Sequence, residues 1–278
     1  MTNSVLRSII NNTFLPNYCV IGDYFEENDL TYNGECKIDG GFTLDFCPYD
    51  SKELFEQNLK TKPEDWYYRT HEVKYTLNSL GYRTREFNDI DWKESIVMFG
   101  CSYVFGIGVT DEHTISYFLE QLSGRPVINM GVGGGSIQTA LHNSIILNDS
   151  KYPTPKAVVH ILTALDRYQL YANNSVTNMG DWDISVGKFQ TPDNMIPFNL
   201  MNIKMIRNLW KNKTIYYEGN IWNYQKLITK LDKEICCEYL KVDFDSGLAR
   251  DFSHADSVQN FKIAKKIYEK LKLQLDNW

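Results

Sequence analysis

From residue 95 onward, short apolar runs alternate with stretches whose apolar residues recur every three to four positions. The short runs are typical of buried strands, and they cover residues 95–99, 126–129, 156–162, 214–217 and 237–243. The recurring pattern is typical of amphipathic helices, and it covers residues 112–122, 136–145, 199–210, 222–235 and 258–271. Strands that alternate with helices in this way form a parallel sheet with helices on both faces. We therefore predict a three-layer α/β/α fold with a central parallel sheet of about five strands.

Polar side chains at the predicted helix starts indicate where the chain turns into each helix. Thr110 or Asp111 is expected to cap the first helix, and Ser136 is expected to cap the second. The last helix is expected to bury one apolar face, made of Val258, Phe261, Ala264, Ile267 and Leu271.

Two stretches lack this alternation. Residues 1–74 are rich in Asn, Asp and aromatic residues, and glycines interrupt their apolar runs, which predicts an irregular accessory extension docked on a main domain of residues 75–278. Residues 166–200 collect Asn, Gly, Asp and Pro, which predicts a long loop with only fragments of regular structure over the carboxyl ends of the strands. Loops of that length are uncommon unless they have a function.

The aromatic residues near the end of the extension have two interpretations. Trp66, Tyr67, Tyr68 and Tyr75 could line a surface that stacks on sugars or bases. Alternatively, they pack the extension onto the main domain, which is the expectation here.

Composition narrows the classes of partner and compartment. The 278 residues are 43% hydrophobic, enough for one substantial core and a small appendage. A net charge of −6 without a basic stripe argues against nucleic-acid binding and favours a neutral or weakly polar substrate. The six cysteines have no disulfide or zinc spacing, the start of the chain lacks the apolar core of a signal peptide, and no run reaches the roughly 18 apolar residues of a membrane helix. We therefore expect a cytoplasmic protein with no metal, no cofactor and no membrane partner.

The strand predicted at 95–99 runs into Gly100, Cys101 and Ser102. Ligands of open α/β sheets bind outside the carboxyl ends of the strands, so Ser102 is well placed for chemistry there, although a turn serine is a common alternative. About 150 residues later comes Arg250-Asp251-Phe252-Ser253-His254, an Asp-x-x-His element directly before the last helix.

Together these two blocks resemble the SGNH (GDSL-type) hydrolase superfamily, which has a Gly-Asp-Ser turn after its first strand and an Asp-x-x-His pair before its last helix. The resemblance extends to residues 78–83, Asn-Ser-Leu-Gly-Tyr-Arg, and to residues 129–136, Asn-Met-Gly-Val-Gly-Gly-Gly-Ser. It covers roughly residues 75–272 and implies the flavodoxin-like three-layer fold of that superfamily.

A serine hydroxyl needs an adjacent base and a third group that orients the base, and Ser102, His254 and Asp251 could fill these roles. The resemblance implies that Ser102 is the nucleophile, His254 the general base and Asp251 its orienting partner. It also implies that Gly134, or Gly133 beside it, donates a backbone N–H to the oxyanion together with Ser102.

Two positions depart from the superfamily's pattern. Cys101 replaces its Asp and is expected to be a buried small residue. The third block, Gly-x-Asn-Asp in the superfamily, is Thr163-Ala164-Leu165-Asp166 here, and Leu165 has no side-chain donor. Thr163 or a residue of the long loop would have to substitute. His142 and His160 are interpreted as structural.

The resemblance implies a serine esterase or acyltransferase that acts on a small O-acyl ester, such as an O-acetylated carbohydrate, through an acyl-serine intermediate. The alternative is a catalytically weak or inactive SGNH-like binding or structural module, which the missing Asn motivates. The Asn-, Ile- and Tyr-rich composition and the Gly-Cys-Ser block also resemble phage-encoded members, which leaves a role in the virion open. The sequence leaves the acyl group, the alcohol, the choice between water and a second alcohol, and the oligomeric state open.

Overall fold

The computed structural model describes residues 41–172, 175–179, 192–222, 237–244 and 247–275. Its centre is a five-stranded sheet with the order β4-β3-β5-β8-β9, in which every neighbouring pair is parallel. The strands are β3 (Ile96–Gly100), β4 (Val127–Gly131), β5 (Ala157–Leu162), β8 (Ile215–Asn220) and β9 (Glu238–Tyr239). The predicted parallel sheet of about five strands is confirmed.

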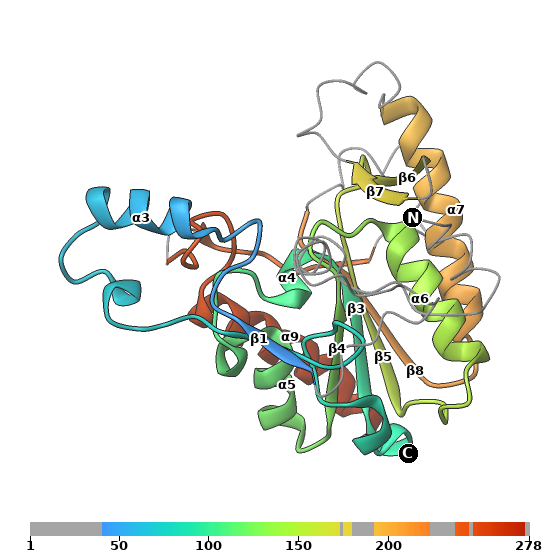
Figure 1. Ribbon diagram of the computed structural model, residues 1–278. Coiled ribbons are helices and arrows are strands. Elements are labelled where there is room, and N and C mark those ends of the chain that lie inside the picture. Colours follow the sequence, from blue (N-terminus) through green and yellow to red (C-terminus); the bar gives the residue numbers. More distant parts are fainter. Residues whose placement is uncertain (1–40, 173–174, 180–191, 223–236, 245–246, 276–278) are drawn as a thin grey trace.

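Helices cover both faces of this sheet (Figure 1). One face packs against α5 (Ile115–Ser123) and α9 (Ser257–Leu275), and the other against α6 (Ile137–Asp149) and α7 (Pro192–Trp210). Successive side chains of a strand point to opposite faces, so Ile96 and Met98 of β3 join the α5–α9 cluster, whereas Val97 and Phe99 join the α6–α7 cluster. The three-layer prediction is therefore correct.

One of the two predicted helix caps is wrong. Helix α5 begins at Ile115, and Thr114 caps it by accepting a 3.2 Å hydrogen bond from the Tyr117 N–H. Thr110 and Asp111 do not cap it, because a 3₁₀ turn, η4 (Asp111–His113), lies between them and the helix. Ser136 caps α6 as predicted, in a reciprocal capping box with Thr139.

The buried face of α9 agrees in part with the prediction. Ala264, Ile267 and Leu271 are core residues as predicted, and Ile263 joins them. Val258 and Phe261 are 49% and 42% exposed, so their assignment to the core was wrong. Asn260 also lies on the buried side of α9, where it donates a 3.0 Å hydrogen bond to the His113 carbonyl.

The stretch predicted as a long loop contains regular structure. Strands β6 (Tyr168–Ala172) and β7 (Ser175–Met179) come after β5 in the chain and pair as an antiparallel hairpin. Helix α7 begins at Pro192, seven residues earlier than predicted. Proline at the first helical position loses no hydrogen bond, so Pro192 starts a helix although it was interpreted as a loop residue. The part of this loop at 180–191, and the helix predicted over 222–235 apart from Trp222, lie outside the described residues.

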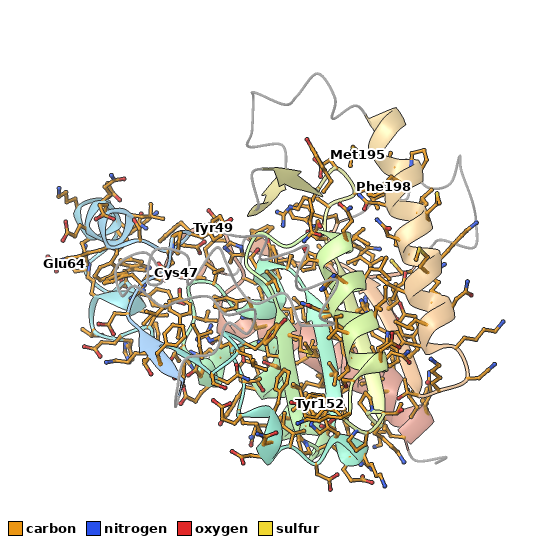
Figure 2. All side chains as sticks on the ribbon, turned by 45° about the vertical axis from the view of Figure 1, so that its right-hand side comes forward. Cys47, Tyr49, Glu64, Tyr152, Met195 and Phe198 are labelled. Carbon is orange, nitrogen blue, oxygen red and sulfur yellow. The ribbon has the colours of Figure 1, made fainter. Side chains whose placement is uncertain are left out.

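The described part of the N-terminal stretch packs against the main sheet's domain. Strand β1 (Phe42–Leu44) pairs antiparallel with β2 (Tyr75–Leu77), across the boundary expected after residue 74, and α3 (Lys52–Thr61) lies between them in the chain. Figure 2 shows Cys47, Tyr49 and Glu64 at this end of the molecule, with Met195 and Phe198 of α7 at the other. Three short 3₁₀ turns also precede β3 in the described chain: η1 (Tyr67–Arg69), η2 (Phe87–Asp89) and η3 (Trp92–Glu94).

A third apolar cluster joins this stretch to the loop after β3. It contains Tyr68, Tyr75 and Leu77 together with Phe105 and Ile107. Tyr68 and Tyr75 are buried and pack the stretch as expected, whereas Tyr67 is 46% exposed and stacks on His71. Residues 1–40 lie outside the described part of the chain. Among the helices that are described, none is both long enough and apolar enough to cross a membrane.

Candidate active site

Ser102 lies where β3 turns into a short helix, α4 (Ser102–Phe105). The turn depends on Gly100, because a Cβ there would lie 2.5 Å from Val104 Cγ2 and 2.9 Å from the Ile161 carbonyl oxygen. Strand β3 is an interior strand between β4 and β5, so Ser102 emerges beside both neighbours at the carboxyl ends of the strands, where open α/β sheets bind ligands.

The tertiary structure brings His254 to Ser102, 152 residues away in the sequence. His254 Nε2 lies 2.8 Å from Ser102 Oγ, and His254 Nδ1 lies 2.5 Å from Asp251 Oδ2. Asp251 Oδ1 also accepts hydrogen bonds of 3.3 Å from the N–H groups of Ser253 and His254. One continuous chain of hydrogen bonds therefore joins the three residues expected from the sequence.

A tight turn makes this convergence possible. A bridge between Leu248 and Ala255 closes the turn, and the Ala249 N–H donates to the His254 carbonyl at 3.0 Å. Phe252 takes a left-handed conformation, with φ 59°, which is uncommon for a residue other than glycine. The turn directs the carboxylate of Asp251 and the imidazole of His254 to the same side.

One aromatic ring packs against the imidazole, and a second packs on the first. The Tyr103 ring lies 5.0 Å from the His254 ring, and Trp222 meets Tyr103 edge-on at 6.2 Å. Burial raises the pKa of Tyr103, and nearby Cys101 and Asp251 raise it further, so its hydroxyl stays protonated. Neither ring was predicted from the sequence. Tyr103 directly follows Ser102, which could have indicated it, whereas no local pattern marked Trp222, two residues after the end of β8.

The glycine-rich stretch after β4 packs beside Ser102's helix. Gly131 pairs with Gly100 in the sheet, and Asn129 Nδ2 donates a 2.7 Å hydrogen bond to the Val104 carbonyl of α4. Gly133 and Gly134 are buried, and Gly134 has φ 67° in the turn that leads into α6. The loop expected to supply an oxyanion donor therefore lies against the element that carries the nucleophile.

In the third block, Leu165 is a core residue, whereas Thr163 lines a narrow space beside Gly100. Leu165 is 3% exposed and packs in the core between the sheet, α6 and α7, and its carbonyl accepts a 2.6 Å hydrogen bond from Asn199. Thr163 is 2% exposed and lines a narrow space together with Gly100 and Ser136. Within the described part of the chain, its hydroxyl has no hydrogen-bond partner. Of Thr163 and Leu165, only Thr163 has a side chain that can donate a hydrogen bond.

Of the remaining residues singled out in the sequence, Cys101 and His160 lie in the core, and His142 of α6 is partly buried. Cys101 is 1% exposed, as expected for a buried small residue, and the described cysteines Cys47, Cys101 and Cys237 are free thiols. His160 is fully buried in β5. No group of three or more His, Cys, Asp or Glu side chains gathers among the described residues.

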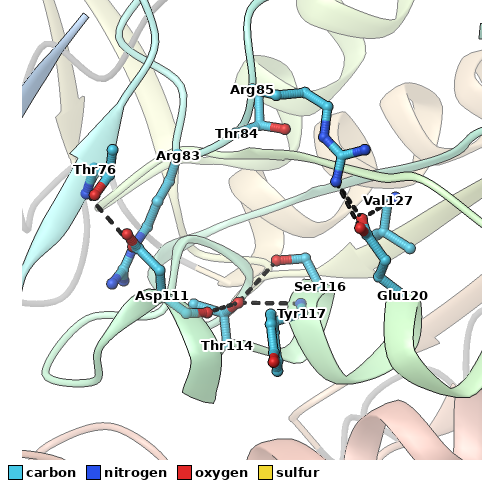
Figure 3. Close-up of a pocket in the computed structure, with 10 residues that line it drawn as sticks. All are labelled: Thr76, Arg83, Thr84, Arg85, Asp111, Thr114, Ser116, Tyr117, Glu120 and Val127. Atoms are coloured by element: carbon cyan, nitrogen blue, oxygen red, sulfur yellow. Dashed lines mark hydrogen bonds and ion pairs between the residues drawn. The ribbon is translucent and has the colours of Figure 1, made fainter. Parts of the chain in front are cut away.

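The lead-in block of residues 78–83 holds the loop that follows α4. Arg83 donates to the carbonyls of Gly106 at 2.5 Å and Val109 at 2.7 Å, and forms a 2.6 Å ion pair with Asp111. Arg83 and Asp111 border a pocket of about 330 Å³. Four charged side chains line this pocket and form two ion pairs, Arg83 with Asp111 and Arg85 with Glu120 (Figure 3). The pocket contains none of Ser102, His254 and Asp251, and its lining residues support the fold.

Comparison with known proteins gave similarities at the level of structure. No protein-family model matches the chain, and no curated protein matches it. A protein described as a GDSL-like lipase from Bacteroides ovatus is similar at 15% identity and TM-score 0.42, over 66% of this chain and 54% of that one, so this chain spans about half of its length.

Two further solved structures are covered almost completely. One, described as a lipolytic protein of the G-D-S-L family from Desulfitobacterium hafniense, shows 14% identity and TM-score 0.42 over 64% of this chain and 99% of that one. The other, a carbohydrate acetylesterase family member from Sinorhizobium meliloti, shows 13% identity and TM-score 0.38 over 66% and 99%. The solved structures to which this chain is similar thus include GDSL or SGNH hydrolases and carbohydrate acetylesterases.

Proposed function

We propose that this chain is a serine esterase of SGNH type that cleaves a small O-acyl ester through an acyl-serine intermediate. The observation that carries the proposal is the hydrogen-bond chain from Asp251 through His254 to Ser102, with distances of 2.5 Å and 2.8 Å. A nucleophile, a base within hydrogen-bonding reach and a carboxylate that orients the base are the requirements for nucleophilic catalysis by serine.

Each step of the proposed reaction is assigned to a residue of this hydrogen-bond chain. Ser102 Oγ attacks the ester carbonyl while His254 Nε2 takes its proton, and Asp251 holds the opposite ring nitrogen so that Nε2 is the free base. The protonated His254 then gives the proton to the departing alkoxide, which leaves the acyl group on Ser102. Water, activated by the same imidazole, hydrolyses the acyl-serine, and a second alcohol in its place would make the chain an acyltransferase.

The oxyanion that forms during attack needs hydrogen-bond donors. Ser102 is the first residue of α4, so its backbone N–H is among the amides that a helix leaves unpaired at its start. The backbone N–H of Gly134, or of Gly133, is proposed as the second donor and the Thr163 hydroxyl as the third. Each donor in such a site contributes about 10²- to 10³-fold to kcat.

The surroundings favour a small acyl group. Ser102 is 5% exposed, and Tyr103 and Trp222 narrow the approach to the imidazole. An acetyl group suits such a space better than a long acyl chain. We propose an O-acetylated carbohydrate as the substrate class, in line with the carbohydrate acetylesterases among the similar structures.

The direct test compares the wild-type chain with Ser102→Ala. The wild-type chain should turn over p-nitrophenyl acetate and react covalently with a serine-directed fluorophosphonate probe, and Ser102→Ala should lose both activities while its melting temperature stays near the wild-type value. Cys101→Ala is the matched control, since it alters the neighbouring buried side chain and should keep both activities.

The alternative function, a binding or structural module without turnover, predicts a different result. Its motivation is Leu165, which replaces the superfamily's Asn and is buried in the core. A folded wild-type chain that neither reacts with the probe nor hydrolyses the ester would favour the module. Labelling that persists in Ser102→Ala would assign the nucleophile to another residue.

A further inference from the structure

Arg250, the residue before Asp251, contacts the N-terminal stretch. Arg250 forms an ion pair with Asp50, and the two side chains are 4% and 0% exposed. Arg250 Nε lies 3.1 Å and 3.0 Å from the two carboxylate oxygens, and a terminal nitrogen lies 2.8 Å from one of them. A planar guanidinium bound by both oxygens of a carboxylate is held in orientation as well as in position.

The backbone of Arg250 is held on both sides as well. Its N–H donates to the Gly108 carbonyl at 3.0 Å, and its carbonyl accepts a 3.2 Å hydrogen bond from Asn58 of α3. The guanidinium also donates to the Asp45 carbonyl at 2.5 Å. The partners Asp45, Asp50 and Asn58 all come from the N-terminal stretch, about 200 residues from Arg250 in the sequence.

The residue after Asp251 is held by the same stretch. Phe252, in its left-handed conformation, packs on Trp66 with ring centroids 5.7 Å apart. The ammonium group of Lys62 lies 3.2 Å from the centroid of the Phe252 ring, in cation–π contact. Asp251 is therefore flanked by two anchored neighbours.

The Asp50–Arg250 pair is also connected, through Tyr75, to the loop that follows the helix of Ser102. The Tyr75 hydroxyl donates to the Asp50 carboxylate and accepts a 2.9 Å hydrogen bond from the Gly108 N–H. Gly108 belongs to the loop after α4, the helix that begins with Ser102. Asp50 and Tyr75 thus connect the loop after the nucleophile with the turn that carries the acid and the base.

We propose that Asp50 and Arg250, with Tyr75, are positioning residues for the Asp251–His254 pair, so that the N-terminal stretch is part of the catalytic apparatus. This inference rests on the proposed function. The physical reason is that a buried ion pair tolerates little displacement, because a shift leaves a charge without its partner. A misplacement of about 1 Å at a reacting group reduces the rate roughly 10²-fold.

The kinetic test uses Asp50→Asn, which keeps the shape of the side chain and removes its charge, and Arg250→Lys, which keeps the charge and removes the planar fork. Both should lower kcat for p-nitrophenyl acetate about 10- to 100-fold, with little change in KM. Glu218→Gln is the matched control, because it breaks the partly buried Arg207–Glu218 pair, with contacts of 2.8 Å, between α7 and β8. That control should lose similar stability and keep kcat.

A second readout does not depend on turnover. The proton that His254 Nδ1 shares with Asp251 is followed by its low-field NMR resonance, assigned by comparison with His254→Gln. In Asp50→Asn this resonance should move or broaden, because an Asp251 carboxylate that has moved no longer holds the proton in the 2.5 Å contact. The control Glu218→Gln should leave the resonance at its wild-type position.

The outcomes separate the two proposals. If the wild-type chain has no esterase activity but the resonance changes in Asp50→Asn, the proposed function fails and the positioning role stands. If the wild-type chain is active, and Asp50→Asn and Arg250→Lys change neither kcat nor the resonance, the positioning role is overturned and the esterase remains. Should Asp50→Asn fail to fold, Tyr75→Phe removes one hydroxyl from the same network, and an unchanged kcat and resonance in that variant overturn the inference equally.

Discussion

At the scale of single residues, His160 illustrates how burial changes the chemistry of a side chain. Its ring is fully buried in β5, stacks on Phe99 with centroids 4.9 Å apart, and shares a 3.0 Å hydrogen bond with Ser144 through Nε2. Burial disfavours the charged ring and lowers the pKa of His160 to about 3, from its ordinary value of 6.5. The folded chain therefore keeps this histidine neutral under mildly acidic conditions.

This shift predicts acid sensitivity. Above about pH 6.5 the ring is neutral in both the folded and the unfolded chain, so it contributes no pH dependence. Between about pH 6.5 and 3 the unfolded chain binds a proton that the folded chain does not bind. The free energy of unfolding should fall over that window as the pH falls, by up to about 1.4 kcal/mol per pH unit from this residue.

Replacing the ring tests this contribution. In His160→Phe the free energy of unfolding should fall less steeply with falling pH, because one protonation site is removed. The variant should also lose about 1–3 kcal/mol of stability at pH 7, because the Ser144 hydroxyl loses its partner. Urea unfolding at pH 7, 6, 5 and 4 measures both effects. His71→Gln, at an exposed position, is the control and should keep the wild-type slope. An equal slope in His160→Phe would show that other groups cause the acid sensitivity.

Thr163, in the third block, gives a second prediction for a single residue. Its buried hydroxyl is the proposed side-chain donor to the oxyanion. If this hydroxyl stabilises the oxyanion, Thr163→Val should lower kcat about 10²-fold with KM nearly unchanged. Stability should stay equal or rise, since the substitution removes a buried polar group without a partner in the described part of the chain. Esterase kinetics and thermal unfolding measure the two effects, and Thr163→Ser should keep most of kcat.

Leu165→Asn provides the contrasting variant. Because Leu165 packs in the core, a new amide would be buried there and should cost about 1–3 kcal/mol or more of stability, with no gain in kcat. A faster Leu165→Asn enzyme would contradict this account and would assign the oxyanion contact to position 165. An unchanged kcat in Thr163→Val would exclude the hydroxyl as a donor.

At the scale of elements, the close approach of β4 to α4 determines where Ser102 lies. A Cβ on Gly131 would overlap the Phe105 backbone nitrogen and lie 2.8 Å from the Val104 carbonyl carbon. These atoms belong to the backbone of α4, so a side chain at position 131 must push the whole helix. The helix begins with Ser102, and its displacement would lengthen the contact with His254.

Gly131→Ala should therefore lower kcat more than 10²-fold, by roughly the effect of a 1 Å misplacement or more, and destabilise the fold by about 1–3 kcal/mol. Gly124→Ala is the matched control: Gly124 ends α5 with φ 64° and has open space around its Cβ direction. That variant should lose about 1–2 kcal/mol through backbone strain alone and keep kcat. Equal activity in both variants, measured with p-nitrophenyl acetate, would show that β4 does not position the nucleophile.

At the scale of the whole molecule, the chain is held together by contacts between segments far apart in the sequence. The three-layer fold that was expected from alternating strands and helices carries Ser102 after β3, an interior strand of the sheet. The N-terminal stretch from residue 41 adds the buried Asp50–Arg250 pair and the cluster of Tyr68, Tyr75 and Phe105. We propose that residues 75–278 form the hydrolase domain and that the described part of the N-terminal stretch completes it.

Several features could be predicted because their signals are local. The apolar runs of β3, β4 and β5 and the capping serine of α6 depend on residues within one turn or strand. The Gly100-Cys101-Ser102 turn and the Asp251-x-x-His254 element are local in the same way. Local signals were less reliable where more than one face of a helix carries apolar residues. The periodicity of α9 placed Val258 and Phe261 on the buried face, but packing leaves both exposed.

The sequence by itself determined the sheet-forming segments, the helices between them and the residue types capable of acyl chemistry. Only the tertiary structure decided that His254 contacts Ser102, that Leu165 packs in the core while Thr163 faces a narrow space, and that Arg250 is paired with Asp50. The physical reason is that periodicity records which residues share a face of one element. Contacts between distant segments depend on how those faces pack, which no local pattern encodes.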